Sequence, residues 1–180
     1  MAANSVPMDL DFTKPPAAAG EPAPAPQSEI GGRRVDMAGN FIYYVRSGAA
    51  RAASAANAPI LVVEDDEDTR RLLDKVLTLQ GFPVRAVADS REFQQELRRP
   101  PLPRLILLDV ELPRVSGFKL LTVLRQHPQT SGIPVVLVTA RSENKDLLYG
   151  LSLGADGYLS KPFTVESLCT MVQKVLRSPA

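Results

Sequence analysis

Apolar residues follow two alternating patterns over the second part of the chain. Short runs such as Ile60-Leu61-Val62-Val63 are apolar at every position, whereas longer stretches such as 69–79 carry Leu or Val at every third or fourth position. Uninterrupted runs are typical of strands buried on both faces, and the longer repeat is typical of helices with one buried face. The expected strands are 60–63, 84–88, 105–108, 134–138 and 158–160, and the expected helices are 69–79, 90–98, 117–126, 145–153 and 164–177.

The alternation of five strands with five helices predicts the fold class. Strands without polar positions need helices on both faces of the sheet, which favours parallel pairing. Right-handed crossovers between such strands give a doubly wound sheet. We therefore predict an α/β fold with a doubly wound five-stranded parallel sheet, in a domain at residues 58–178. Residues that bind ligands are expected beyond the carboxyl ends of its strands.

Residues 1–57 differ in composition from the rest of the chain. They are rich in Ala and Pro, most clearly at 14–26, and such a sequence buries too little apolar surface to offset its chain entropy. We expect a largely disordered extension. Within it a weak hairpin is expected at 33–45, because Gly39 and Asn40 suit a turn and the aromatic run after them suits a strand. An isolated hairpin is marginal in water, so we expect it to pack on the folded domain.

Charge and cysteine content favour a soluble protein. The chain has 21 basic and 20 acidic residues, so no general field for attracting nucleic acid is expected. Its one cysteine, Cys169, cannot form a disulfide within the chain, which fits a reducing compartment. No apolar run approaches the ~20 residues of a membrane helix, and the N-terminus lacks the pattern of a secretory signal. We expect a cytoplasmic location, no membrane contact and no direct binding of nucleic acid.

Polar side chains follow four of the five expected strands at the point where each strand ends. Since the carboxyl ends of parallel strands share one edge of the sheet, these side chains are expected to converge there. They are Glu64, Asp65 and Asp66 after the first strand, Asp109 after the third, Thr139 and Ala140 after the fourth, and Lys161 and Pro162 after the fifth.

This set suits phosphoryl transfer assisted by a divalent cation. Clustered carboxylates repel one another, and a cation removes that cost; an all-oxygen site with few carboxylates suits Mg²⁺. Lys161 can place a positive charge beside a phosphoryl group, and Thr139 can donate its hydroxyl. Asp109 is the candidate nucleophile, because a carboxylate can form an acyl phosphate.

Each member of the set also has an ordinary structural interpretation. Acidic residues at 64–66 favour the start of a helix, Asp109 could simply end a strand, and Lys161-Pro162 could be a turn. The pairs Arg70-Arg71 and Arg98-Arg99 are interpreted as solvated helix faces. The functional interpretation rests on the joint pattern, since several strand ends carry compatible chemistry on one edge.

The same residues resemble the receiver domain of response regulators in two-component signalling, a family that includes single-domain chemotaxis regulators. The resemblance covers about 58–177, and the spacing between its motifs is that of the family. The motifs are Ile60 to Asp66, Leu107 to Pro113 followed by Ser116-Gly117, Val138 to Ala140, and Gly154 to Phe163. The resemblance implies a flavodoxin-like (βα)5 fold and a phosphorelay response regulator.

The resemblance also implies roles for individual residues. Asp109 would accept a phosphoryl group from a sensor histidine kinase or phosphotransfer protein. Mg²⁺ would be bound by Asp65, Asp109 and the backbone carbonyl of Glu111, with Glu64 acting mostly through water. Phosphoryl oxygens would contact Thr139, Ala140 and Lys161.

A switch between two packings is part of the same resemblance. Thr139 would move toward the phosphoryl group, Tyr158 would fill the vacated space, and the face of the fourth and fifth helices would change. An unknown downstream protein would read that change, and the resemblance allows a phosphorylation-dependent dimer through the fourth and fifth helices. The peptide bond before Pro162 would be cis.

One position departs from the commonest pattern of the family, and two positions that vary within the family flank the site. Glu64 stands where Asp is commoner, and its longer side chain should still act through water. Glu111 and Arg141 carry opposite charges beside the site. Our hypothesis is that they pair across its mouth and hinder the hydrolytic water.

Several functions compete at this point. The leading one is a stand-alone receiver that signals through protein–protein contacts, because too little sequence follows Pro179 for an output domain. Alternatives are a receiver module acting on transcription through a partner, a receiver that signals without phosphorylation, and a Mg²⁺-dependent aspartyl-phosphate phosphatase. Such phosphatases carry Asp-x-Asp, which Asp109-Val110-Glu111 does not match. We therefore expect no enzyme beyond its own phosphotransfer and autodephosphorylation. A DNA reader in the extension is disfavoured by its five basic and five acidic residues before Ala58.

Overall fold

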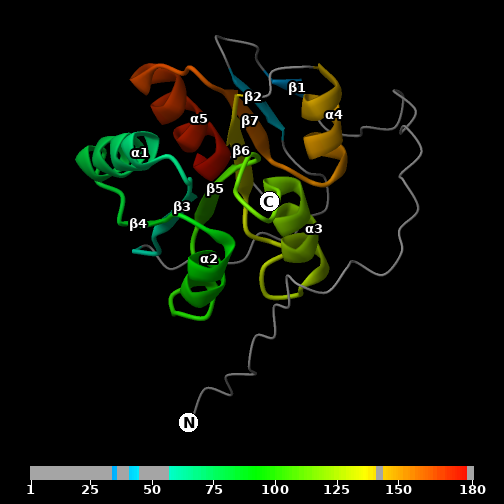
Figure 1. Cartoon of the computed structure of the whole chain (residues 1–180). Helices are drawn as coiled ribbons and strands as arrows, with labels where there is room; N and C mark the ends of the chain where they lie inside the picture. The colour runs from blue at the N-terminus through cyan, green and yellow to red at the C-terminus, as the bar shows by residue number, and fades with distance from the viewer. Residues whose placement is uncertain (1–33, 36–40, 45–56, 141–143, 178–180) are drawn as a thin grey trace.

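The computed structural model describes residues 34–35, 41–44, 57–140 and 144–177. In these residues one mixed sheet is covered by helices on both faces (Figure 1). Five strands pair in parallel in the order β4-β3-β5-β6-β7, which confirms the predicted doubly wound α/β fold. Their bounds are β3 Ile60–Val63, β4 Val84–Val87, β5 Leu105–Asp109, β6 Val135–Thr139 and β7 Gly157–Ser160.

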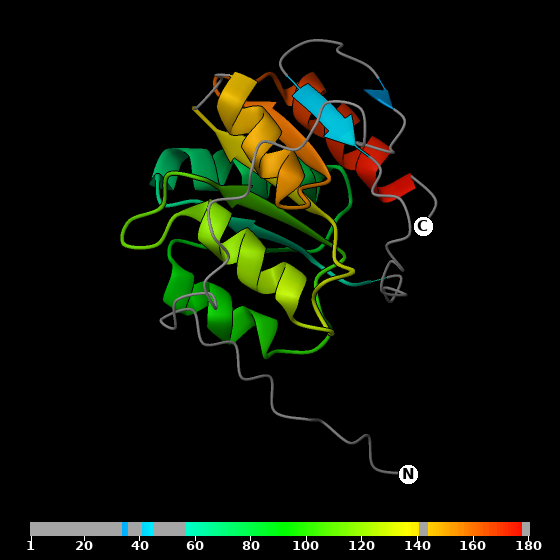
Figure 2. The ribbon, with the colours of Figure 1, turned by 90° about the vertical axis from the view of Figure 1, so that its right-hand side faces the viewer.

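In the described part of the chain, five helices connect or follow the parallel strands. Figures 1 and 2 show α1 and α5 on one face of the sheet and α2, α3 and α4 on the other. Their bounds are α1 Glu67–Leu79, α2 Ser90–Leu97, α3 Gly117–Gln126, α4 Asn144–Ser152 and α5 Val165–Arg177. Among the described residues, none of the helices combines the length and the apolar character needed to cross a membrane.

The two faces of the sheet bury alternate residues of each strand. In β3, for example, Ile60 and Val62 pack in the cluster under α1 and α5, whereas Leu61 and Val63 pack in the cluster under α2, α3 and α4. Successive side chains of a strand point to opposite faces, so a run that is apolar at every position supplies both clusters. The continuous apolar runs in the sequence therefore reflect burial on both sides.

Short polar side chains define where the helices begin. The Asp66 carboxylate accepts a hydrogen bond from the Thr69 N–H at 2.8 Å, so α1 starts at Glu67, two residues before its expected start. Asp89 caps α2 by accepting bonds from two backbone N–H groups, and Ser90, the expected cap, is the first helical residue. Gly81, just after α1, has φ of +83°, a conformation that glycine adopts without strain.

Within the residues that the structure describes, the sheet has two strands more than the predicted five. Residues 33–45, expected as a weak hairpin, contain β1 Arg34–Val35 and β2 Phe41–Tyr44, which pair antiparallel. Strand β2 also pairs antiparallel with β7, so it extends the parallel sheet at that edge. The expected disorder of the rest of residues 1–57 lies outside the described residues.

Close packing between α3 and β5 fixes the end of β5. Gly117 starts α3, and its N–H donates to the Val110 carbonyl at 3.0 Å. A Cβ added at Gly117 would lie 2.1 Å from the backbone oxygen of Asp109. That approach is far below van der Waals contact with backbone atoms, so only glycine lets the helix start here.

We expect Gly117→Ala to shift the end of β5 and to lower the free energy of unfolding by roughly 1–3 kcal/mol, the usual cost of overpacking. Urea unfolding measures the change. Gln126→Ala, at an exposed position of the same helix, is the matched control and should change stability little. Equal stabilities of the two variants would contradict this account of the α3 start.

Candidate functional site

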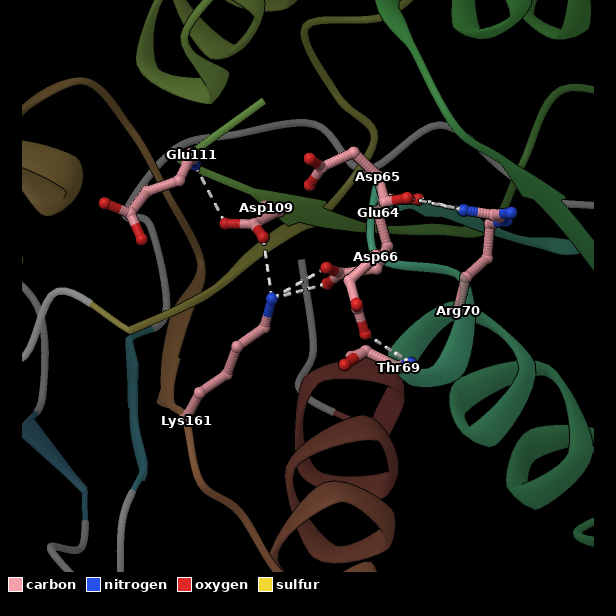
Figure 3. Close-up of polar contacts among 8 residues, drawn as sticks. All are labelled: Glu64, Asp65, Asp66, Thr69, Arg70, Asp109, Glu111 and Lys161. Atoms are coloured by element: carbon pink, nitrogen blue, oxygen red, sulfur yellow. Dashed lines mark hydrogen bonds and ion pairs between the residues drawn. The ribbon is translucent and has the colours of Figure 1, made fainter. Parts of the chain in front are cut away.

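A polar site lies where β3, β5, β6 and β7 end. Asp109 is the last residue of β5 and Thr139 the last of β6, while Glu64 directly follows β3. Lys161 directly follows β7. The structure thus brings together at one edge the residues that the sequence predicts there, and Figure 3 shows the Glu64 and Asp109 carboxylates turned toward the Lys161 ammonium.

The Lys161 ammonium bridges two buried carboxylates. Its Nζ donates to Asp109 Oδ2 at 2.6 Å and to Glu64 Oε1 at 2.8 Å, and it lies 2.7 Å from Glu64 Oε2 (Figure 3). Glu64 is 1% exposed and Asp109 is 4% exposed. Two carboxylates removed from water would repel each other strongly, so the shared ammonium is what makes their joint burial tolerable.

Burial sets the protonation behaviour of this group. Burial raises the pKa of Glu64 to about 7, and the negative charge of Asp109 adds to the rise, although the ammonium of Lys161 opposes it. For Lys161, burial alone would lower the pKa, but hydrogen bonds to Asp109 and Glu64 outweigh it and the pKa is raised. The ammonium is therefore held charged, while Glu64 binds its proton more tightly than an exposed carboxyl does.

The second oxygen of Asp109 is also held. Its Oδ1 accepts a hydrogen bond from the Glu111 N–H at 2.9 Å, and its Oδ2 accepts from Lys161. Both oxygens thus have a donor, which fixes the plane of the carboxylate at the end of β5. The Glu111 side chain is exposed, and the predicted role of its carbonyl stays a prediction.

Three carboxylates lie close enough to hold one cation. Oxygens of Glu64, Asp65 and Asp109 lie within 4.8 Å of one another, with Asp65 exposed at the rim. Such a set of hard oxygen ligands, partly open to water, fits an ion such as Mg²⁺, which usually keeps several waters. The fit to Mg²⁺ is argued from the kind of ligand atoms alone. All three residues offer hard carboxylate oxygens, whose negative charge would neutralise the cation.

Arg70 holds the backbone of the acidic segment, a role that the sequence analysis missed. Its Nη1 donates to the carbonyls of Glu64 at 2.9 Å and Asp65 at 3.0 Å (Figure 3). The interpretation of Arg70 as part of a solvated face is therefore wrong, whereas its neighbour Arg71 does pair with Glu67 at the surface. The signal was available: a cation near the start of a helix opposes the helix dipole and needs another reason to be there.

The remaining predicted residues surround this group. Thr139 is fully buried, and its carbonyl accepts a hydrogen bond from the Lys161 N–H at 2.8 Å, while Ala140 next to it is exposed. Tyr158, in β7, is buried in the cluster under α2, α3 and α4. The peptide bond between Lys161 and Pro162 is cis. Arg141 lies outside the described residues, and with it the expected pairing to Glu111.

Comparison with known proteins gives a consistent result. The family described as response regulator receiver domain matches residues 60–173. The chain is 40% identical over 124 residues to the transcriptional regulatory protein GltR of Pseudomonas aeruginosa, a match that covers 69% of this chain and 51% of that protein. It is 41% identical over 118 residues to the phosphate regulon transcriptional regulatory protein PhoB of Rhizobium meliloti, covering 66% of this chain and 52% of that protein. The chain thus spans about half the length of these relatives.

Solved structures agree with the sequence matches. The chemotaxis protein CheY4 of Vibrio cholerae superimposes with a TM-score of 0.62 at 29% identity, covering 67% of this chain and 99% of that one. A response regulator from Chloroflexus aurantiacus superimposes with a TM-score of 0.61 at 34% identity, over 67% of this chain and 99% of that one.

Removing the Arg70 guanidinium should loosen the acidic segment. We expect Arg70→Gln to weaken Mg²⁺ binding about tenfold, as loss of a residue that orients metal ligands typically does. Calorimetric titration of Mg²⁺ into the metal-free protein measures the dissociation constant. Arg71→Gln removes the same charge one residue away and is the matched control. Equal affinities in the two variants would show that Arg70 contributes only its charge.

Proposed function

The chain belongs to the response regulator receiver family, and on that premise we propose that it accepts a phosphoryl group on Asp109. The observation that supports this assignment is the geometry of that carboxylate. Asp109 ends β5 at the edge where ligands bind in such sheets, and both of its oxygens are oriented by donors. A carboxylate held in this way is oriented to attack phosphorus, because little reorganisation is needed to bring one of its oxygens in line with the phosphorus atom.

The proposed step is a phosphoryl transfer. An oxygen of Asp109 forms a bond to phosphorus while the bond from phosphorus to the donor breaks, and the donor keeps that electron pair. The donor is a phosphohistidine of a sensor histidine kinase or phosphotransfer protein. The product is an acyl phosphate on Asp109. Negative charge on the phosphoryl oxygens is balanced by Lys161, whose ammonium is held charged.

We assign the cation of the reaction to the acidic cluster. Glu64, Asp65, Asp109 and the Glu111 carbonyl would hold Mg²⁺, with Glu64 acting largely through water. The ion, when bound, supplies positive charge between the carboxylates and the phosphoryl oxygens. The proximity of the three carboxylates supports this assignment. The Lys161 ammonium now bridges two of these carboxylates. With a bound cation to neutralise them, that ammonium would be able to turn to the phosphoryl group.

The output of the phosphorylated state is assigned to β6 and β7. Thr139 and Ala140 would contact the phosphoryl group from the end of β6, and Tyr158 would respond to the movement of Thr139. The hydrogen bond from the Lys161 N–H to the Thr139 carbonyl ties the two strand ends together, which supports a joint movement. The change is a shift of population between two packings. A downstream protein, or a second copy through α4 and α5, would read it.

Transcriptional control is the second candidate function. GltR and PhoB are named transcriptional regulators, and this chain is similar to about half of each. We propose a cytoplasmic receiver with no turnover of small substrates, which acts on transcription through a partner rather than by its own contact with nucleic acid. Transcript profiles of cells carrying wild type or Asp109→Ala distinguish this role, and identical profiles under the inducing signal would exclude it.

The phosphorylation site itself can be tested by intact-mass spectrometry after incubation with Mg²⁺ and acetyl phosphate. We expect the mass of one phosphoryl group on the wild type, no addition on Asp109→Ala, and loss of the addition when the cation is chelated. Asp66→Ala is the matched control, since its exposed carboxylate lies on the same rim but caps α1, and it should be phosphorylated normally. An adduct that persists in Asp109→Ala would contradict the assignment.

A further inference from the structure

The edge of β7 is paired with a strand from a distant part of the chain. Strand β2 runs antiparallel to β7, with Phe41 opposite Leu159, Ile42 opposite Tyr158 and Tyr43 opposite Gly157. On its other side β7 pairs with β6. Figure 1 shows β2 beside β7, and β2 also lies against α5. The hairpin of β1 and β2 therefore covers the edge at which the parallel sheet would otherwise end.

Without this hairpin, β7 would present an unprotected edge. One side of its backbone, around Gly157 to Leu159, would have N–H and C=O groups without strand partners. Natural edge strands are commonly protected by charged residues, proline or bulges, and Gly157–Ser160 has no charge and no proline. Among the described residues, the last strand on this side of the sheet is instead β1, which is only two residues long and contains Arg34. A very short, charged strand is a poor template for further pairing.

We propose that the hairpin of β1 and β2 is an edge guard, which occupies in cis a surface on β7 that would otherwise pair with the β7 edge of a second copy of this chain. The edge already accepts an antiparallel strand. Two copies related by a two-fold axis present β7 to each other in that same antiparallel sense. Because Gly157–Ser160 carries no charge, the two strands meet without repulsion. This inference does not depend on phosphoryl transfer.

The test uses the full-length chain with the double substitution Ile42→Pro and Tyr43→Pro. Proline lacks the N–H needed for the ladder and disfavours strand pairing, so the substitution should detach β2 from β7 without touching the receiver core. The control is Ala50→Pro with Ala53→Pro, two prolines between β2 and β3. Light scattering across a concentration series gives the mass, and hydrogen exchange gives the protection of the Gly157–Leu159 amides.

In dilute solution, the amides of Gly157–Leu159 that face β2 should exchange about tenfold faster or more in the double variant, because their partners are gone. At high concentration its mass should double relative to the wild type, and their protection should return. A synthetic peptide of residues 39–46, added in excess, should restore the wild-type mass. The control should match the wild type throughout.

Two results would overturn the proposal. Unchanged protection at Gly157–Leu159 would mean that β2 does not cover the edge, and faster exchange with no gain in mass would mean that the edge does not accept a second copy. Protection of the Leu107 and Val136 amides reports whether the core of the sheet is intact. If the double variant loses it, Tyr43→Pro alone provides the same two readouts.

Discussion

The shared ammonium of Lys161 is the interaction on which the rest of the site depends. It joins Asp109 and Glu64, which are both almost completely buried at the ends of neighbouring parallel strands. Without a cation between them, two buried carboxylates would have to take up protons or move apart. The ammonium removes that conflict and keeps the acidic group assembled, so that a divalent ion and a phosphoryl group meet residues already in place.

Contacts with the backbone hold the acidic residues around the ammonium in place. Gly117 lets α3 approach the Asp109 carbonyl, and the Glu111 N–H orients the carboxylate itself. Arg70 holds the carbonyls of Glu64 and Asp65 from the first turn of α1. Each constraint is local and modest in energy, but all act on the same few atoms. Positioning of this kind is the main contribution a protein makes to phosphoryl transfer.

The fold and most of the site could be predicted from the sequence. Apolar runs such as Ile60 to Val63 reflect burial on both faces of the sheet. The carboxyl ends of parallel strands lie at one edge, so the polar residues that follow them were expected together. The side-chain partners of Arg70 could not be predicted, since helical periodicity reports exposure and not hydrogen bonds to a preceding loop. The sequence predicts a hairpin that packs on the domain, but not that its strand β2 pairs with β7. A pairing such as that of Phe41 with Leu159 depends on which edge of the sheet is open. The strand order decides which edge that is, and the residues of the hairpin do not.

The central claim is that the charge of Lys161 compensates the buried carboxylates. The test compares the free energies of unfolding of wild type and Lys161→Met from pH 5 to 8, without divalent cations. Burial raises the pKa of Glu64 from its ordinary value of 4.5 to about 7, so the stability that its protonated form contributes is lost as the pH rises between these two values. Without the ammonium the pKa rises further. We predict similar stabilities near pH 5 and a deficit of roughly 3 kcal/mol for Lys161→Met at pH 8, partly recovered with Mg²⁺. Parallel stability curves across the whole pH range would contradict the account.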